Sequence, residues 1–189
     1  MRLLVFAAIL PVLAAVVLAC GGDSAETPTP APSATATPWS GQTEPFVITP
    51  SQVALREDFG VVIDVRIGAH PEEGGFNRFV IEFAYGRPAG HLQYFDKNEV
   101  VSCGPGFLVP LKGETVLLLT LQPSAQHLNY VPTSAPRELL GPGPSILEAK
   151  NICDFEAVVQ WAIGTSGRQP FRVTYLDSPS RIVIDVKNP

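Results

Sequence analysis

The stretch FEAVVQWAIGTSGRQPFRVTYLDSPSRIVIDVK, residues 155–187, predicts three short β-strands joined by two turns. Successive side chains of a strand face opposite sides of a sheet, so alternation of large apolar residues marks a buried face. This alternation runs through residues 157–163, 171–176 and 181–187. Gly164 and Gly167 supply a reversal after the first run, and Asp177 with Pro179 supplies one after the second. We therefore expect three strands of one antiparallel sheet with a single buried side.

The same alternation recurs earlier in the chain. It occupies residues 59–67, 76–84 and 90–95. The side chains expected to face inward in the first two runs are Val61, Ile63, Val65, Ile67, Phe79, Ile81 and Phe83. Residues 115–121, TVLLLTL, are instead apolar almost throughout, which is typical of a strand that is covered on both faces.

Prolines and glycines interrupt these runs. Residues 98–113 are expected to be irregular with at most a brief strand, and the five prolines of residues 122–144 oppose long regular structure there. Residues 136–140 are predicted to make one helical turn, and Ser145 with Glu148 has the capping-box spacing for another. Evenly spaced strands with little helix predict an all-β fold, an antiparallel β-sandwich or a partly open β-barrel with one or two short helical turns.

The N-terminal segment predicts export and a lipid anchor. Residues 1–19 contain one charged residue, Arg2, followed by an apolar run that is typical of a secretory signal peptide. The small Ala19 suits a cleavage site, and the Cys20 thiol would accept a diacylglycerol. An uncleaved anchor or a single transmembrane helix is the alternative, although the run is slightly short for one. We expect a lipoprotein on the extracytoplasmic face of the cell membrane.

A tether is predicted between the anchor and the domain. Residues 21–45 are nearly all Gly, Ser, Thr, Ala and Pro, so residues 20–45 should form a disordered, semi-extended linker. Its coil dimension would be about 25–30 Å. Trp39 is its one large side chain, and we expect it to be exposed without a role; the alternative is contact with the domain or with the bilayer interface. The folded domain is expected to span residues 46–189.

Three cysteines constrain the chemistry of the chain. With Cys20 assigned to the lipid, Cys103 and Cys153 remain as an even pair in an oxidising compartment, which favours a disulfide between them. Two separate buried thiols are the alternative. A metal site is not favoured, because no second Cys or His lies at ligand spacing beside either residue.

The charge balance excludes some partners. The chain has 13 basic and 18 acidic residues, and removal of Arg2 with the signal peptide leaves 12 against 18, a net charge of −6. This acidity argues against nucleic acid and against anionic lipid head groups as general partners. Membrane contact is expected through the acyl chains of the anchor.

No motif predicts catalysis or a cofactor. His70, His91 and His127 are scattered without metal-ligand spacing, and we expect each to be a solvated histidine. No serine has the setting of a nucleophile elbow, and no glycine run has the order of a phosphate loop. We therefore expect a protein that is not an enzyme.

Outward polar residues are the candidates for binding a ligand. They are Arg78, Glu82, Arg168, Arg172 and Asp185. The planar donor fork of arginine suits carboxylates, which peptide stems and acidic sugars carry. Cross-strand ion pairing, for example between Arg172 and Asp185, is the alternative that we favour. Trp161 and Tyr175 could stack on sugars, but their apolar neighbours favour a place in the core.

Several short segments together resemble the AMIN-like domain of bacterial lipoproteins and secreted proteins. They are GFNRFVIEF (75–83), DFE (154–156), WAIG (161–164), RQPFRV (168–173) and PSRIVIDV (179–186). The resemblance covers residues 61–186. Asn77 stands where the family pattern suggests aspartate, and Ala157 stands where it suggests glycine.

The resemblance implies a β-rich, non-catalytic module that targets the cell wall or an envelope assembly. It does not imply amidase activity, since no zinc-amidase catalytic domain fits in this chain. The expected function is binding of peptidoglycan or a related envelope glycan. A protein-docking module of an envelope complex is the alternative, and a solute-binding accessory whose residues 122–144 cover a pocket is a third possibility.

Overall fold

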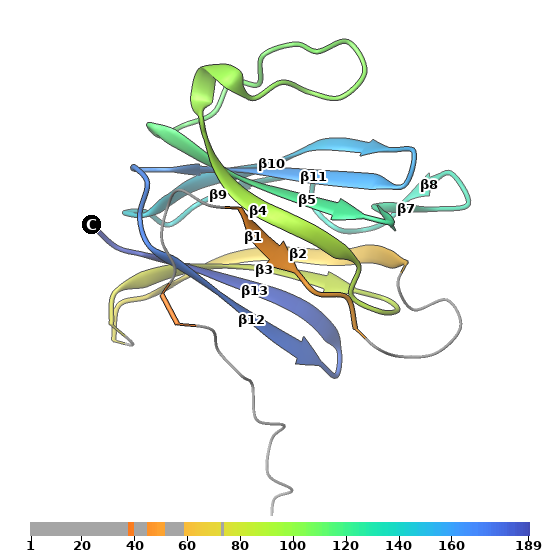
Figure 1. The fold of residues 1–189 in the computed structure, drawn as a ribbon, viewed down its shortest axis with the longest axis horizontal. Coiled ribbons are helices and arrows are strands. Elements are labelled where there is room, and N and C mark those ends of the chain that lie inside the picture. Colours follow the sequence, from red (N-terminus) through yellow and green to blue (C-terminus); the bar gives the residue numbers. More distant parts are fainter. Residues whose placement is uncertain (1–37, 40–44, 52–58, 73) are drawn as a thin grey trace, which may run out of the picture. The chain divides into compact units, whose positions relative to one another are not determined.

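The computed structural model describes residues 38–39, 45–51, 59–72 and 74–189. The predicted signal peptide of residues 1–19, the lipidation site Cys20 and most of the predicted tether lie outside these residues. Two β-sheets stack face to face in the described part, so the expected all-β sandwich is confirmed (Figure 1). No helix among the described residues has the length and apolar character needed to cross a membrane.

The six-stranded sheet has the spatial order β1-β4-β5-β11-β10-β9. Its strands are β1 (Phe46–Ile48), β4 (Ala89–Asp96), β5 (Thr115–Gln122), β11 (Val158–Thr165), β10 (Ile146–Phe155) and β9 (Glu138–Leu140). The five-stranded sheet has the order β12-β13-β3-β2-β6. Its strands are β12 (Phe171–Asp177), β13 (Ser180–Lys187), β3 (Phe76–Phe83), β2 (Gly60–His70) and β6 (Ser124–Ala125). A separate hairpin consists of β7 (His127–Leu128) and β8 (Val131–Pro132), and η1 (Lys97–Glu99) is a 3₁₀ turn.

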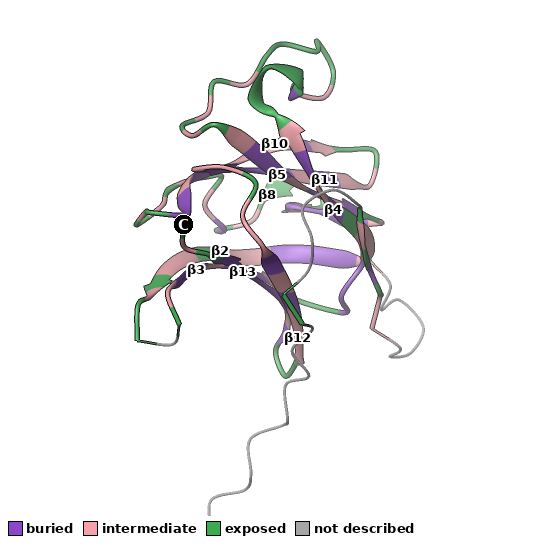
Figure 2. Cartoon of the chain, turned by 60° about the vertical axis from the view of Figure 1, so that its left-hand side comes forward, coloured by how far each residue is buried: buried purple, intermediate pink, exposed green. Residues whose placement is uncertain are grey.

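The main core lies between the two sheets, where the inner faces appear as buried strand surface in Figure 2. Phe79, Ile81 and Phe83 point into it from β3, as the alternation predicts. Trp161 is fully buried there and Tyr175 packs against its edge, which confirms both as core residues rather than exposed sugar platforms.

The three C-terminal strands do not form one sheet, so that prediction is wrong. β11 lies in the six-stranded sheet, whereas β12 and β13 lie in the five-stranded sheet, and residues 166–170 cross between them. Alternation identifies the buried face of a strand but does not identify the layer that covers it. Here the Trp161 face of one sheet is buried against the Phe171 face of the other.

A β-bulge changes the expected face of the first half of β2. Val62 pairs with Phe83 and Asp64 pairs with Glu82, so Ile63 is an extra residue on this strand. Val62 therefore enters the core in place of Val61 and Ile63, while Val65 and Ile67 face it as predicted. One inserted residue is enough to reverse which side chains face the core on the N-terminal side of the bulge.

Both predicted helical turns are wrong. Within residues 136–140, Glu138–Leu140 forms β9 and pairs with β10, and the Ser145–Glu148 segment opens β10 itself. The side-chain oxygen of Asn77 accepts hydrogen bonds from the backbone N–H groups of Ser145 (3.1 Å) and Ile146 (2.9 Å). A side-chain carbonyl from another strand thus accepts from the Ser145 N–H, which in a capping box would donate to the Glu148 side chain.

The expected disulfide between Cys103 and Cys153 is present, with 5.2 Å between the two Cα atoms. It ties the connection between β4 and β5 to β10. Beneath that connection, Val100 packs with Val116 and Ala162 in a second, smaller apolar cluster on the outer face of the six-stranded sheet. β5 is therefore covered on both faces, as its continuous apolar sequence predicts.

Candidate functional site

Three of the five predicted binding residues lie side by side on the outer face of the five-stranded sheet. Asp185 of β13 pairs in register with Arg172 of β12 and with Arg78 of β3. Its carboxylate accepts hydrogen bonds from Arg78 Nε (2.7 Å) and Nη2 (3.0 Å) and from Arg172 Nε (2.8 Å). The Asp185 side chain is only 1% exposed, because the two guanidinium groups cover it. The expected cross-strand ion pairing is confirmed, and the description of Asp185 as exposed is wrong.

Glu82 and Arg168 lie apart from this triad. Glu82 Oε2 is 3.3 Å from Arg66 Nη2 on β2 of the same sheet. Arg168 lies in the crossing between β11 and β12, where its Nη2 is 3.1 Å from Asp96 Oδ1 at the end of β4. The structure thus divides the predicted set into three separate ion-pair groups.

Trp39 contacts the domain, contrary to the expectation of an exposed linker residue without a role. Its ring lies 4.7 Å from the Arg172 guanidinium carbon and 6.1 Å from the Phe76 ring, edge to face. Arg78 and Arg172 also lie over Phe76, at 5.1 Å and 4.9 Å. The charged groups on this face bond to one another and aromatic rings lie against the arginines, so its geometry fits a structural role better than ligand capture.

A second polar site lies at the ends of two tight hairpins. The turn between β7 and β8 has Asn129 and Tyr130 at φ 50° and 66°, and the turn between β10 and β11 has Glu156 and Ala157 at φ 48° and 61°. Positive φ at both central residues is the signature of a type I′ turn, whose twist matches that of the paired strands. These conformations are unfavourable for residues other than glycine and often mark functional surfaces.

The turn at Ala157 supports a stability prediction. Ala157→Gly should stabilise the domain by about 1 kcal/mol, because glycine adopts the left-handed conformation without a clash of its Cβ. Urea unfolding should show the gain as a higher midpoint with an unchanged slope. The exposed strand residue Ala69 is a control, since Ala69→Gly should destabilise by about 0.5 kcal/mol. A lower midpoint for Ala157→Gly would contradict the turn geometry.

The two turns border an open groove of about 390 Å³, which we call the tip groove. Its lining residues are His127, Tyr130, Pro132, Arg137, Asp154, Phe155 and Glu156. Tyr130 is 97% exposed and Phe155 is 61% exposed, so two aromatic rings project into solvent at its margin. The His127 ring stacks on Tyr130 with 6.4 Å between the ring centres.

Asp154 fixes the polar groups of the tip groove. Its Oδ1 accepts hydrogen bonds from the Gln126 backbone N–H and from His127 Nδ1, both at 2.9 Å, and its Oδ2 accepts one from Arg137 Nη2 at 2.7 Å. Burial alone would raise the pKa of Asp154, but the bonds from Gln126, Arg137 and His127 outweigh burial and hold its pKa below the ordinary value. The groove therefore presents an oriented imidazole and guanidinium beside exposed aromatic rings.

The lowered pKa of Asp154 predicts acid-dependent stability. The folded state keeps this carboxylate ionised at pH values where the unfolded chain binds a proton. The contribution of Asp154 to folding stability is therefore fully present above the ordinary pKa of 3.8 and is lost as pH falls through the lowered pKa of the folded state. Asp154→Asn should be less stable than the parent protein at pH 7, and this difference should shrink towards pH 3. Thermal unfolding at both pH values measures it.

Asp177→Asn is the matched control for that experiment. Asp177 also pairs with an arginine, Arg87 at 3.1 Å, but its side chain is 73% exposed, so its loss should change stability little at either pH. An Asp154→Asn difference that stays constant between pH 7 and pH 3 would contradict the prediction.

Sequence reasoning missed the tip groove. His127 was expected to be solvated, yet it is half-buried against Asp154; His70 likewise stacks on Phe76 at 5.0 Å, and only His91 is exposed as predicted. The available signal was Asn129, since asparagine favours the first central position of a type I′ turn. Among the described residues, no group of three or more His, Cys, Asp or Glu is arranged to hold a metal ion.

Comparison with known protein families gives one match, to the AMIN-like domain, over residues 60–188. No curated protein and no solved structure matches the chain. The matched range begins at the first residue of β2 and includes the tip groove and every strand of the two sheets except β1. It covers more than half of the sequence, and the chain therefore belongs to the AMIN-like domain family.

Proposed function

We propose that this protein is a lipid-anchored, extracytoplasmic, non-catalytic module that binds peptidoglycan or a related envelope glycan in the tip groove. The observation that carries the proposal is the pairing of two exposed aromatic rings, Tyr130 and Phe155, with the polar network centred on Asp154. The AMIN-like family supports a binding role rather than a catalytic one.

The chemistry of the groove suits a sugar chain. A pyranose ring has an apolar face that stacks on exposed aromatic rings, which supply rigid contact area with few rotatable bonds. Hydroxyl groups at its rim need hydrogen-bonding groups in fixed positions, which His127 and Arg137 provide through their bonds to Asp154, and Glu156 adds an acceptor to the lining. The Arg137 fork can also pair with the carboxylates of peptide stems.

A pull-down with purified sacculi tests this proposal. The protein should sediment with sacculi above a serum albumin control, and Tyr130→Ala with Phe155→Ala should lower the bound fraction about tenfold by removing both stacking surfaces. Tyr85→Ala is the matched control, because Tyr85 is also exposed but lies on the connection between β3 and β4, outside the groove. No enrichment of the parent protein, or an equal loss in the control, would reject glycan binding at this site.

The proposed anchor is tested separately. The support for it is the apolar N-terminal run that ends at Cys20. Metabolic labelling with radioactive palmitate should mark the parent protein, and Cys20→Ser should abolish the label and release the chain from membranes. Labelling that survives this substitution would reject Cys20 as the lipidation site.

The alternative function is docking to an envelope protein. The supporting observation is that β12, seven residues long, lies at the end of the five-stranded sheet. Edge strands of this length can be extended by a strand from another chain. Crosslinking in intact membranes should then yield one discrete protein partner, whereas a glycan-binding module requires none.

A further inference from the structure

The connection between β4 and β5 combines an apolar sequence with exposed side chains. We call residues 97–114 the β4–β5 loop. Residues 100–111, VVSCGPGFLVPL, contain no charged side chain, although the chain as a whole carries a net charge of −5. Phe107 is 70% exposed and Leu108 is 61% exposed, and the loop stands out as exposed surface above the six-stranded sheet (Figure 2).

The loop packs the residues at its base, Val100 and Leu111, against the sheet and exposes those at its tip, Phe107 and Leu108. Val100 belongs to the small apolar cluster on the outer face of the six-stranded sheet, and Leu111 packs against that cluster. Phe107 and Leu108 are equally apolar but do not join either core cluster. Packing within the domain therefore accounts for the apolar residues at the base and not for those at the tip.

The tip is held in a fixed conformation. Val101 and Leu108 form a β-bridge, the Ser102 N–H donates to the Phe107 carbonyl at 2.9 Å, and the Val109 N–H donates to the Val100 carbonyl at 3.1 Å. The disulfide of Cys103 fastens the loop to β10. Because its backbone is already ordered, insertion of the tip into another phase would lose little conformational entropy.

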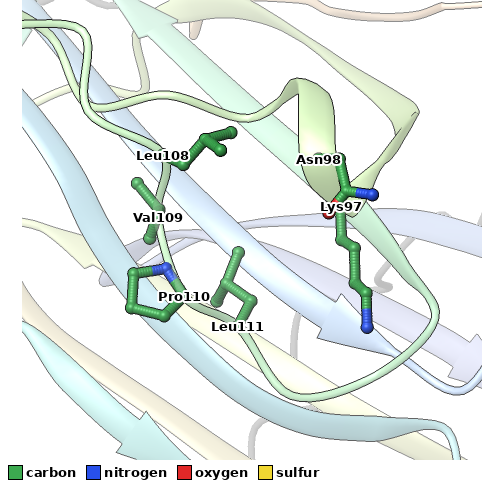
Figure 3. A pocket seen from close by; sticks show the side chains of 6 residues that line it. All are labelled: Lys97, Asn98, Leu108, Val109, Pro110 and Leu111. Atoms are coloured by element: carbon green, nitrogen blue, oxygen red, sulfur yellow. The ribbon is translucent and has the colours of Figure 1, made fainter.

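A groove of about 400 Å³ runs along one side of the loop. Leu108, Val109, Pro110 and Leu111 line one wall, and Lys97 and Asn98 stand opposite (Figure 3). The Lys97 ammonium donates to the Gly113 carbonyl at 3.3 Å, and Lys112, the residue before Gly113, is exposed. An aliphatic surface with a cation opposite it complements a phospholipid, whose phosphate lies next to acyl chains.

The small size of the tip favours a bilayer over a protein. Phe107 and Leu108 together present roughly 300 Å² of apolar surface, well below the 800 Å² or so that each partner buries in a specific protein interface of standard size. A bilayer makes no such demand, since each apolar side chain that enters the acyl boundary contributes independently.

We propose that the tip of the β4–β5 loop inserts into the phospholipid surface, with Phe107 and Leu108 in the acyl boundary and Lys97 and Lys112 beside the head-group phosphates. The site is separate from the tip groove and does not depend on glycan binding. Its effect would be to orient the domain on the membrane, with the loop directed towards the lipid.

Depth-dependent fluorescence quenching tests the insertion. The full chain is mixed with phosphatidylcholine vesicles whose acyl chains carry bromine. The variants Phe107→Trp and Leu108→Trp each add one tryptophan, and its fluorescence is obtained by subtracting that of the parent protein. Both reporters should lose most of their added fluorescence. Tyr85→Trp is the matched control, because Tyr85 precedes β4 whereas the loop follows it, and its fluorescence should remain.

Each outcome decides the proposal. Quenching of Phe107→Trp that disappears when Leu108→Asp is added, with thermal unfolding unchanged, supports insertion of this tip. Absence of quenching at both loop positions overturns it, and so does equal quenching of Tyr85→Trp, which would indicate a domain lying non-specifically on the vesicle. A change in the fluorescence of Phe107→Trp that occurs only after envelope proteins are added would indicate that the loop tip binds a protein, and would also overturn the proposal.

Discussion

Asp185→Asn is expected to destabilise the domain by about 3 kcal/mol, because it removes a buried carboxylate that two arginines share. The Asp185 side chain is 1% exposed and accepts three hydrogen bonds from Arg78 and Arg172. Asparagine keeps the shape but removes the negative charge that lies between the two guanidinium groups. Both arginines are partly exposed, so water recovers some of the loss and keeps the effect at the lower end of that for a fully buried pair.

Asp64→Asn is the control for this prediction. Asp64 pairs with Arg66 on the outer face of the same sheet, but its side chain is 43% exposed, so its removal should change the free energy of unfolding by less than about 1 kcal/mol. Urea unfolding of both variants gives the comparison. Equal effects would contradict the view that burial, rather than pairing alone, makes Asp185 important.

A triple replacement separates the effect of the triad on stability from any effect on glycan binding. If Arg78, Arg172 and Asp185 are replaced together by apolar residues of similar size, most of the lost stability should return, because no buried charge remains unpaired. The glycan-binding proposal requires sacculus binding by that variant to be unchanged, since the triad lies outside the tip groove. Weakened sacculus binding with restored stability would indicate that the triad takes part in ligand binding.

Alternation predicted most strands because it depends only on neighbours in the chain. β3, β4, β12 and β13 all lie within a few residues of their expected bounds, and Trp161 is in the core. It failed where the chain crosses from one sheet to the other, as between β11 and β12, because the same side chains are buried whether consecutive strands share a sheet or face each other across the core. It also failed at Ile63, because a single bulged residue reverses the phase and leaves no mark in composition.

The binding residues were harder to predict than the strands. The pairing of Arg172 with Asp185 was correctly expected, but the place of Arg78 beside them depends on strand order and register, which the sequence does not determine. The tip groove brings together His127 and Asp154, 27 positions apart, through two hairpins that end at the same place. Proline-rich residues 122–144 read as irregular, and only the pairing of β7 with β8 and of β9 with β10 reveals their order.

Removal of the Cys103–Cys153 disulfide is expected to have the largest effect on stability. The bridge closes a loop of 50 residues, and in the chain-entropy model a constraint of that length stabilises the folded state by about 4 kcal/mol. The double variant Cys103→Ala, Cys153→Ala should therefore unfold at a much lower urea concentration. It should still fold, because the main core between the sheets contains neither cysteine.

Reduction of the parent protein is the matched comparison. In dithiothreitol the parent should unfold near the midpoint of the double variant, whose own midpoint should not change. Coincident midpoints for the oxidised parent and the double variant would contradict the loop-closure account. The Phe107→Trp reporter gives a second measurement. Without the disulfide, the β4–β5 loop keeps the contacts of Val100 at its base, but its tip loses the attachment to β10. Bromolipid quenching of this reporter should therefore weaken in the double variant, as the free energy of unfolding falls.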